Sequence, residues 1–290
     1  YKRSSPVKPK VIGWHMDLHD FNLPVAIQKL EQMPFHGLIL RPRNARRIAN
    51  GTFTEEDARY NTAILKTVDF QRFKHNFLHD SLTGHRGHQV SPDFFQDWTA
   101  VIAGRRRYAR MCKEIGFDGI WFDVENYGGK DCANLASSSY QDKNKSFTEC
   151  KKQVKLRARQ MMSAMLTEFP DIKVMTSFGL GVGTGSGDLD LLPAFCDGLL
   201  EAVASDQAYA RAQVIDGYED GYYIATVKGY QRAYDRMRRP GGIAYHRPQQ
   251  DEAWATFGRA AFGLTPSEKR LDFAKAQFIS AMNRTDEYVW

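Results

Sequence analysis

Short apolar runs alternate with longer segments of helical spacing along most of the chain. The apolar runs are near-continuous rather than alternating, which is typical of strands that are buried on both faces. Eight runs predict strands, at 11–16, 37–40, 73–78, 118–124, 173–178, 198–203, 213–218 and 287–290. The pattern therefore indicates a parallel sheet covered by helices.

The segments between these runs predict the helices. They lie at 23–33, 55–66, 93–115, 147–169 and 223–239, with further helical segments within 252–282. Thr54 and Ser146 are candidate N-caps because their hydroxyl oxygens can accept from free N–H groups in the first helical turn. Gly116 is suited to ending the third helix. Eight strands alternating with helices predict an α/β fold, a single-domain (β/α)8 TIM barrel over 11–290, with 1–10 as a leader or linker and a long loop after strand four.

Composition excludes few classes of protein. The 290 residues include 42% hydrophobic and 26% charged residues, and no apolar stretch approaches the roughly 18 residues of a membrane span. The net charge of +6 admits an acidic partner. The two basic clusters, 105–107 and 151–159, fall on predicted helices, where we expect solvated faces. We therefore expect no nucleic-acid partner and no membrane-spanning segment, and the oligomeric state stays open.

The cysteines bear on cellular location. Cys112 and Cys196 lie in apolar settings and predict buried thiols, whereas Cys132 and Cys150 bracket a polar segment. A Cys132–Cys150 disulfide would suit an exported protein. The polar, proline-bearing leader is of the kind left after removal of a signal peptide or lipoprotein anchor. We expect an extracellular or periplasmic location.

The segment 116–129, "GFDGIWFDVENYGG", places charge at the end of an apolar strand. Because side chains alternate along a strand, Trp121, Asp123 and Glu125 share one face. If the other face packs on helices, both carboxylates face the space that the sheet encloses. We expect these acids to have a function.

Active sites of α/β barrels form where the strands end. The candidates there are aromatic, charged and amide side chains at seven strand ends: Trp14, His15 and Asp17; Arg41 and Arg43; Asn76 and His79; Asp123, Glu125, Asn126 and Tyr127; Glu201; Glu219 and Tyr222; and Trp290. Carboxylates held close together raise one another's pKa, so that one stays protonated while another ionises. Cleavage of a glycosidic bond uses such a pair and needs no cofactor.

The stretches "FDVENY" and "IDGYEDGYY", together with an aromatic eighth strand, resemble the retaining glycoside hydrolases of the large barrel clan. The chain also looks like exported bacterial proteins described only as hydrolase-like. The resemblance implies that Glu125 is the acid/base and Glu219 the nucleophile. The clan commonly has Asn-Glu in strand four, whereas this chain has Val124 before the glutamate and Asn126 after it, which leaves Asp123 and Glu201 as substitutes.

The expectation is thus an exported glycoside hydrolase acting on a poly- or oligosaccharide, possibly an anionic one. The binding residues would be Trp14, His15, Asp17, Arg41, Arg43, Asn76, His79, Asn126, Tyr127, Tyr222 and Trp290. A non-catalytic carbohydrate-binding barrel is the alternative, with the acids capping helices or paired with arginines.

Two other kinds of site are less well supported by the sequence. His15, Asp17 and His19 resemble the first metal-binding strand of amidohydrolase barrels, but predicted strands five and six contain no histidine, so we expect no metal. The glycines at 179–187 alternate strictly, and the dinucleotide-binding fingerprint fails on spacing. We expect a loop over the barrel mouth there, and no cofactor.

Overall fold

The computed structural model describes residues 8–17, 23–84, 90–127, 131–179, 189–224, 226–237, 258–264 and 271–290, with only the backbone described at 15, 16, 227 and 271–273. Its strands are β1 (Lys10–Asp17), β2 (Gly37–Arg41), β3 (Phe77–Ser81), β4 (Gly119–Asp123), β5 (Lys173–Thr176), β6 (Gln213–Asp216), β7 (Gly258–Ala260) and β8 (Tyr288–Val289). They form one sheet in the order β7-β6-β5-β4-β3-β2-β1-β8, and every pair is parallel. A parallel bridge between Phe262 and Val289 joins the two edges. The predicted (β/α)8 barrel is confirmed.

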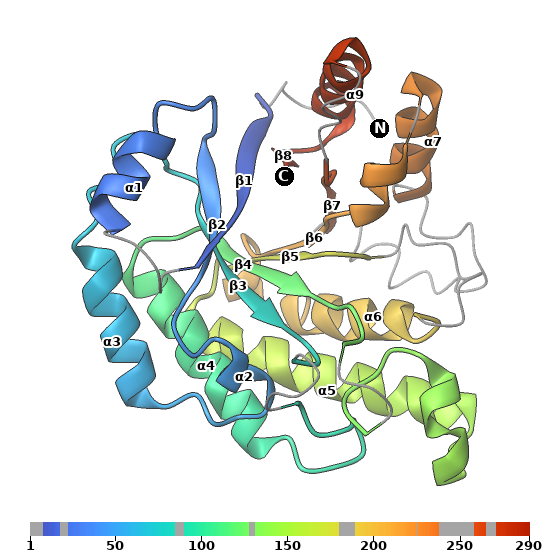
Figure 1. Cartoon of the computed structure of the whole chain (residues 1–290). Coiled ribbons are helices and arrows are strands. Elements are labelled where there is room, and N and C mark those ends of the chain that lie inside the picture. The colour runs from blue at the N-terminus through green and yellow to red at the C-terminus, as the bar shows by residue number, and fades with distance from the viewer. Residues whose placement is uncertain are drawn as a thin grey trace.

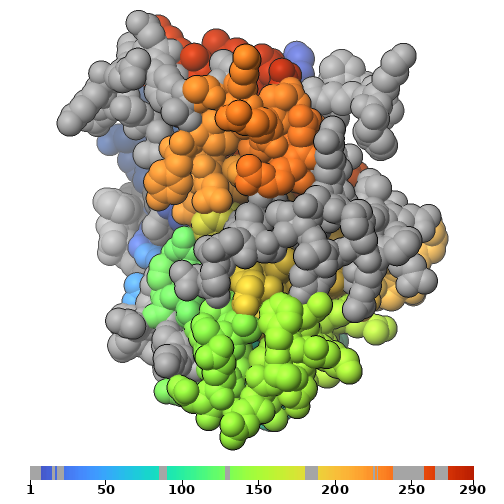
Figure 2. All heavy atoms as spheres, turned by 90° about the vertical axis from the view of Figure 1, so that its right-hand side faces the viewer, coloured from blue at the N-terminus to red at the C-terminus, as the bar shows by residue number. Residues whose placement is uncertain are grey.

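The helices lie outside the sheet (Figure 1). They are α1 (Leu23–Leu30), α2 (Arg46–Ala49), α3 (Glu55–Lys66), α4 (Thr99–Glu114), α5 (Phe147–Glu168), α6 (Leu192–Val203), α7 (Val227–Met237) and α9 (Leu271–Arg284), with 3-10 turns η1 (Ser137–Lys143), η2 (Gln207–Tyr209) and η3 (Glu219–Tyr223). No helix in the described ranges is long and apolar enough to cross a membrane. Figure 2 views the side toward which β3 and β4 point, with α7 near one end of this face and the η1–α5 segment at the other.

Local chemistry explains the helix ends that the sequence predicted. Thr54 and Ser146 each form a capping box, with Asp57 and Glu149 as the respective third helical residues. Gly116 has a φ of +77°, the left-handed conformation that ends α4 after Ile115. These predicted ends of α3, α4 and α5 are confirmed.

The buried side chains form two layers. Inside the barrel lies a cluster from alternate strand positions: Ile12, Ile39, Phe77, Trp121, Met175, Ile215, Ala261, Tyr288 and Trp290. A larger cluster fills the space between strands and helices and includes the opposite faces, such as Ile120 and Phe122 of β4. Trp121 therefore faces the barrel interior, as predicted, and Asp123 lies on the same face toward the strand end.

The predicted strand at 198–203 is wrong, because this segment lies in α6. The helix is buried on several sides, so its residues form a continuous apolar run. A short run of this kind does not tell a buried helix from a buried strand. Glu201 consequently does not reach the mouth of the barrel and forms an ion pair with Lys155 of α5. The strand predicted as the seventh is β6, and no apolar run predicted β7, which has three residues.

The predicted Cys132–Cys150 disulfide is also wrong. None of the four cysteines forms a disulfide, and all four are buried. The polar segment between Cys132 and Cys150 contains η1, and its cysteines pack as small apolar side chains. The expectation of export loses this support and stays a prediction; the leader that motivated it lies mostly outside the described residues.

The basic cluster at 105–107 is only partly a solvated face. Arg105 is fully buried and pairs with Asp80 at 3.0 Å. Arg107 donates to the carbonyl of Phe53, and Arg106 pairs with Glu168 on the surface. Arg105 therefore anchors the end of β3 and does not contribute a solvent-exposed charge.

An ion network lies at the end of the barrel where the strands begin. Asp118 accepts from Tyr288 at 2.8 Å, lies 2.9 Å from His75 Nδ1 and pairs with Lys173 at 3.3 Å, and Lys173 also pairs with Glu287. Burial alone would raise the pKa of Asp118, but the hydrogen bond with His75 and the charge of Lys173 lower it to about 2. The network joins the starts of β4, β5 and β8.

Asp118→Asn should destabilise the protein by about 2 kcal/mol at pH 7, because the folded-state pKa lies below the ordinary value of 3.8. A lowered carboxyl pKa stabilises the folded state above the unfolded-state pKa, and this stabilisation disappears as the pH falls from about 4 toward 2. Urea unfolding of both proteins at pH 7 and pH 3 measures it. An equal difference at the two pH values would contradict the assignment.

Candidate active site

Asp123 is the last residue of β4, and the loop that follows holds its carboxylate in place. Its Oδ1 accepts from the backbone N–H of Glu125 at 2.9 Å and lies 3.5 Å from the Ser177 hydroxyl. The same hydroxyl accepts from the N–H of Val124 at 3.1 Å. The ends of β4 and β5 thus position one buried carboxyl group.

Glu125 follows two residues later and is half-buried. The Tyr127 hydroxyl donates to its carboxylate. Thr83, in the loop after β3, lies 3.0 Å from the Glu125 carbonyl oxygen and accepts from the Tyr127 N–H at 3.2 Å. The loops after β3 and β4 therefore fix the Glu125–Tyr127 pair together.

Glu219 reaches the same end of the barrel through a tight turn after β6. Tyr218 has a φ of +43°, which is uncommon for a residue other than glycine, and its N–H donates to Asp216 at 3.1 Å. A Cβ on Gly217 would lie 2.4 Å from the carbonyl oxygen of Thr176, so no side chain fits there. The Glu219 N–H then donates to the carbonyl of Ser177 at 2.9 Å. Backbone strain of this kind clusters at functional sites.

The three carboxyl groups interact electrostatically. Burial, with a smaller contribution from the charge of Glu125, raises the pKa of Asp123 to about 7. Burial and the charges of Glu125, Asp123 and Asp220 raise the pKa of Glu219 to about 8. Burial also raises the pKa of Glu125. No cation of the described chain is among the causes that act on Glu219 or Glu125 in this acid cluster (Asp123, Glu125, Glu219). Glu219, with a pKa of about 8, is the member that stays mostly protonated at pH 7.

Aromatic rings line the interior beside the acid cluster. Trp14 lies with its ring centroid 4.1 Å from that of Trp121 and 5.3 Å from that of Trp290, and His79 stacks on Trp121 at 5.3 Å. Tyr222 meets Trp290 at 5.7 Å. Burial and, to a smaller extent, the charges of the acid cluster raise the pKa of Tyr222. The aromatic wall (Trp14, His79, Trp121, Tyr222 and Trp290) therefore adjoins the acids.

Two indole N–H groups of this wall differ in their partners. Trp290 Nε1 donates to the Gly217 carbonyl at 2.9 Å and so ties the wall to the turn before Glu219. Trp121 Nε1 is buried without a hydrogen-bond partner among the described residues. Leaving such a donor unpaired is costly, which favours a ligand or water at this point of the interior.

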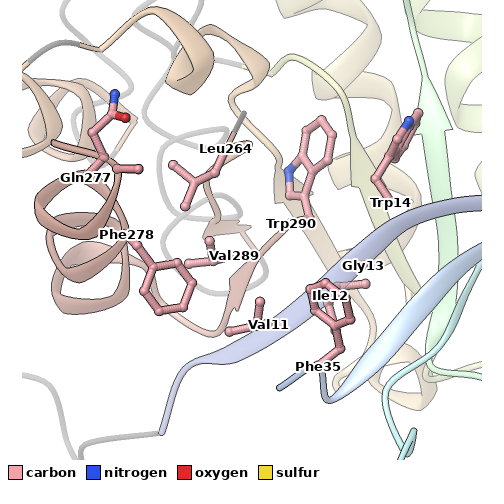
Figure 3. Close-up of a pocket in the computed structure, with 11 residues that line it drawn as sticks. Val11, Ile12, Gly13, Trp14, Phe35, Leu264, Gln277, Phe278, Val289 and Trp290 are labelled. Carbon is pink, nitrogen blue, oxygen red and sulfur yellow. The ribbon is translucent and has the colours of Figure 1, made fainter. Parts of the chain in front are cut away.

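A pocket of about 280 Å³ opens between β1, β8 and α9. Trp14 and Trp290 lie at one side of it, and Val11, Val289 and Phe278 at the other (Figure 3). The pocket therefore adjoins the aromatic wall directly.

Several other predicted residues occupy different places. Arg41 forms a bidentate ion pair with Asp17. The exposed Arg43 donates a hydrogen bond to the Tyr60 hydroxyl at 3.1 Å. Asn76 precedes β3, at the opposite end of the barrel from the mouth. Its side-chain amide accepts a hydrogen bond from the Leu38 N–H and donates one to the Phe73 carbonyl.

Other side chains add little to the acid cluster. Asn126 is exposed in the loop after β4, and the side chain of His15 lies outside the described set. No group of three or more His, Cys, Asp or Glu in the described ranges is arranged to hold a metal ion. The structure thus brings Asp123, Glu125, Tyr127, Glu219 and the aromatic wall together, and it places Glu201, Asn76 and Arg43 elsewhere.

The fold and this mouth define a (β/α)8 barrel with a carboxyl-rich site. No family model and no curated protein matches the sequence. Among solved structures, the chain is similar to morphinone reductase in complex with tetrahydroNAD, with a TM-score of 0.51 and 11% sequence identity over 97% of this chain and 82% of that chain. Similarity at this identity shows the fold.

The solved structure just described is a reductase. On this comparison the predicted enzyme class and function, a glycoside hydrolase, are wrong. Polysaccharide degradation and the carbohydrate-binding alternative were inferred from the same motifs and are not carried further. The likeness of "FDVENY" and "IDGYEDGYY" to the barrel clan reflects strand ends that present acids, which barrels of many activities share. The expected absence of a nucleic-acid partner stays a prediction.

Glu125→Gln should lower the pKa of Glu219 and of Asp123, because the charge of Glu125 raises both. Carbon-13 NMR of labelled carboxyl groups follows each titration, and the Glu219 midpoint should move below its wild-type value of about 8. Glu56→Gln, on the exposed face of α3, is the matched control and should leave both midpoints in place. Unchanged midpoints in Glu125→Gln would show that the acid cluster is not coupled.

Proposed function

We propose that the barrel is an oxidoreductase in which the acid cluster supplies the proton that accompanies reduction of a polar double bond in a small organic substrate. The observation that carries the proposal is the convergence of Asp123, Glu125 and Glu219 beside a partly open aromatic wall, where burial and the neighbouring charges raise the pKa of Glu219 to about 8. An acid with a pKa near the working pH is the most effective proton donor. The neighbouring fold, a reductase solved with tetrahydroNAD, favours redox chemistry over other acid-catalysed reactions.

The residues at the mouth fit the nicotinamide end of such a cofactor. Trp14 is 46% exposed and offers a stacking face, and the Glu125 carboxylate attracts the positive charge that an oxidised nicotinamide ring carries. The fit to the diphosphate is weaker in the described part of the mouth, because Arg41 is held by Asp17. When bound, a reduced nicotinamide supplies a hydride, the two electrons of the reduction.

The protein's own groups hold and move the proton. Glu219 donates its proton to the heteroatom of the double bond as the hydride reaches the carbon, and its carboxylate regains a proton from water. Glu125 and Asp123 keep the pKa of Glu219 high, since any charge on them disfavours a second one. The Tyr127 hydroxyl orients Glu125.

Glu219→Gln should lower the rate of substrate-dependent NADH or NADPH oxidation by about 10²–10⁴-fold, the usual contribution of a general acid. A panel of aldehydes, enones and cyclic imines serves as substrates, with Glu56→Gln as control. The variant should be at least as stable as the wild type at pH 9, because it removes a carboxyl whose folded-state pKa is raised. Wild-type rates in Glu219→Gln, or no oxidation of either cofactor with any member of the panel, would refute the proposal.

The wild-type rate should fall as the pH rises through about 8, because the donor must be protonated and Glu219 loses its proton there. Rates at saturating cofactor between pH 5.5 and 10 measure this limb. A rate that stays constant up to pH 10 would exclude Glu219 as the proton donor.

A further inference from the structure

The pocket between β1 and β8 lies beyond the two residue pairs that join these strands. Lys10 pairs with Tyr288 and Val11 with Val289, which are the two residues of β8. The register of β1 on β2 then shifts between Gly13 and Met16. The two strands thus leave a slot in the barrel wall, which we call the β1–β8 slot, lined by the residues of Figure 3.

The lining of the slot is apolar. Val11, Phe35, Leu264, Phe278 and Val289 contribute hydrocarbon surface. Gln277 is the polar exception, and its amide donates to the Ile224 carbonyl rather than to the cavity. At about 280 Å³ the slot lies near the lower end of small-molecule sites, roughly 300–1,000 Å³.

Two glycines are closely packed at and near the slot. A Cβ on Gly13, which lines the slot, would come within 2.8 Å of a Leu38 methyl group, so a side chain does not fit there. A Cβ on Gly263 would lie 2.8 Å from the Tyr222 ring and 2.9 Å from the Trp290 ring. Trp290, which lines the slot, and Tyr222 therefore both pack against Gly263.

The far end of the slot has the opposite character. Trp14 and Trp290 line it with aromatic rings, and beyond them lies the acid cluster, on which no described cation acts at Glu125 or Glu219. A ligand with a positive charge would lie near both the ring faces and the Glu125 carboxylate, which attract it. The molecule thus offers an apolar chamber next to a cation-accepting wall.

We propose that the β1–β8 slot binds the apolar body of a hydrophobic imine, whose nitrogen takes the proton of Glu219 and is then held as an iminium cation by the Glu125 carboxylate beside Trp14 until the hydride reaches its carbon. The inference rests on the proposed function in using the same site, and it names the substrate class: a hydrophobic nitrogen compound rather than a neutral carbonyl compound. The unpaired Trp121 Nε1 donor lies next to this place, below Asp123 on the inner face of β4.

Binding is measured without turnover, by tryptophan fluorescence or calorimetry on the full chain. Benzyltrimethylammonium carries both features of the ligand, tetramethylammonium only the charge, and benzyl alcohol only the apolar body. Benzyltrimethylammonium should bind at least about tenfold more tightly than either fragment. Equal affinities for benzyltrimethylammonium and benzyl alcohol would overturn the cationic part of the proposal.

A matched pair of variants on α9 locates the binding. Ala274 lines the slot, whereas Ala276, two residues further along the same helix, is exposed and does not line it. Ala274→Trp should fill the slot and abolish binding of benzyltrimethylammonium, and Ala276→Trp should leave it unchanged. Leu264→Trp fills the slot from the opposite side and should act as Ala274→Trp does. Unimpaired binding in folded Ala274→Trp and Leu264→Trp would overturn the location.

Glu125→Gln separates this inference from the proposed function. The variant removes the carboxylate charge that acts on Asp123 and Glu219, so it should weaken benzyltrimethylammonium and leave benzyl alcohol unchanged. Cation binding with these properties but no cofactor oxidation would refute the oxidoreductase and leave the binding site standing. Cofactor oxidation with neutral carbonyl substrates and no preference for cations would support the oxidoreductase and refute the substrate class.

Discussion

The structure at the barrel mouth depends on the cost of keeping carboxyl groups next to buried aromatic rings. Asp123 and Glu219 cannot both ionise cheaply there, because burial removes water from them and neighbouring acids oppose a second charge. The fold supplies no arginine or lysine for Glu125 or Glu219 in its described part, although it supplies such partners for Asp17, Asp80 and Asp118 elsewhere. The same chain thus neutralises acids that hold the structure together and leaves uncompensated the acids that face the mouth. That contrast is the reason for assigning chemistry to the acid cluster.

Much of the barrel was predictable from local pattern. The strands near 11–16, 37–40, 118–124 and 173–178 and the helix at 55–66 follow from continuous apolar runs, helical spacing and the cap at Thr54. Two features were not predictable. The run at 198–203 is as apolar as a strand because α6 is buried on most sides, and β7 is too short to leave a pattern. Counting eight strands was therefore right although one of the eight was misplaced, since the missed β7 compensates for it.

The site was predictable to the extent that strand ends were assigned correctly. Asp123, Glu125 and Trp290 follow from alternation along β4 and from the aromatic end of β8, and Glu219 follows from the end of a strand that was numbered wrongly but placed correctly. Glu201 failed with its strand, and Asn76 failed because β3 begins at Phe77 rather than at 73. The β1–β8 slot could not be predicted, because it depends on how β1, β8 and α9 pack together, and no pattern along the chain records that. The activity was misassigned because paired acids at barrel mouths serve several chemistries, and the motifs that carried the resemblance were short.

The central claim is that Glu219 carries a proton at neutral pH. Infrared difference spectroscopy of the wild type against Glu219→Gln reports this directly, since a protonated carboxyl and a carboxylate absorb at different frequencies. The account predicts a protonated-carboxyl band at pH 7 that is absent from the variant and disappears from the wild type above pH about 9, beyond the pKa of about 8. A difference spectrum that shows only carboxylate at pH 7 would contradict it.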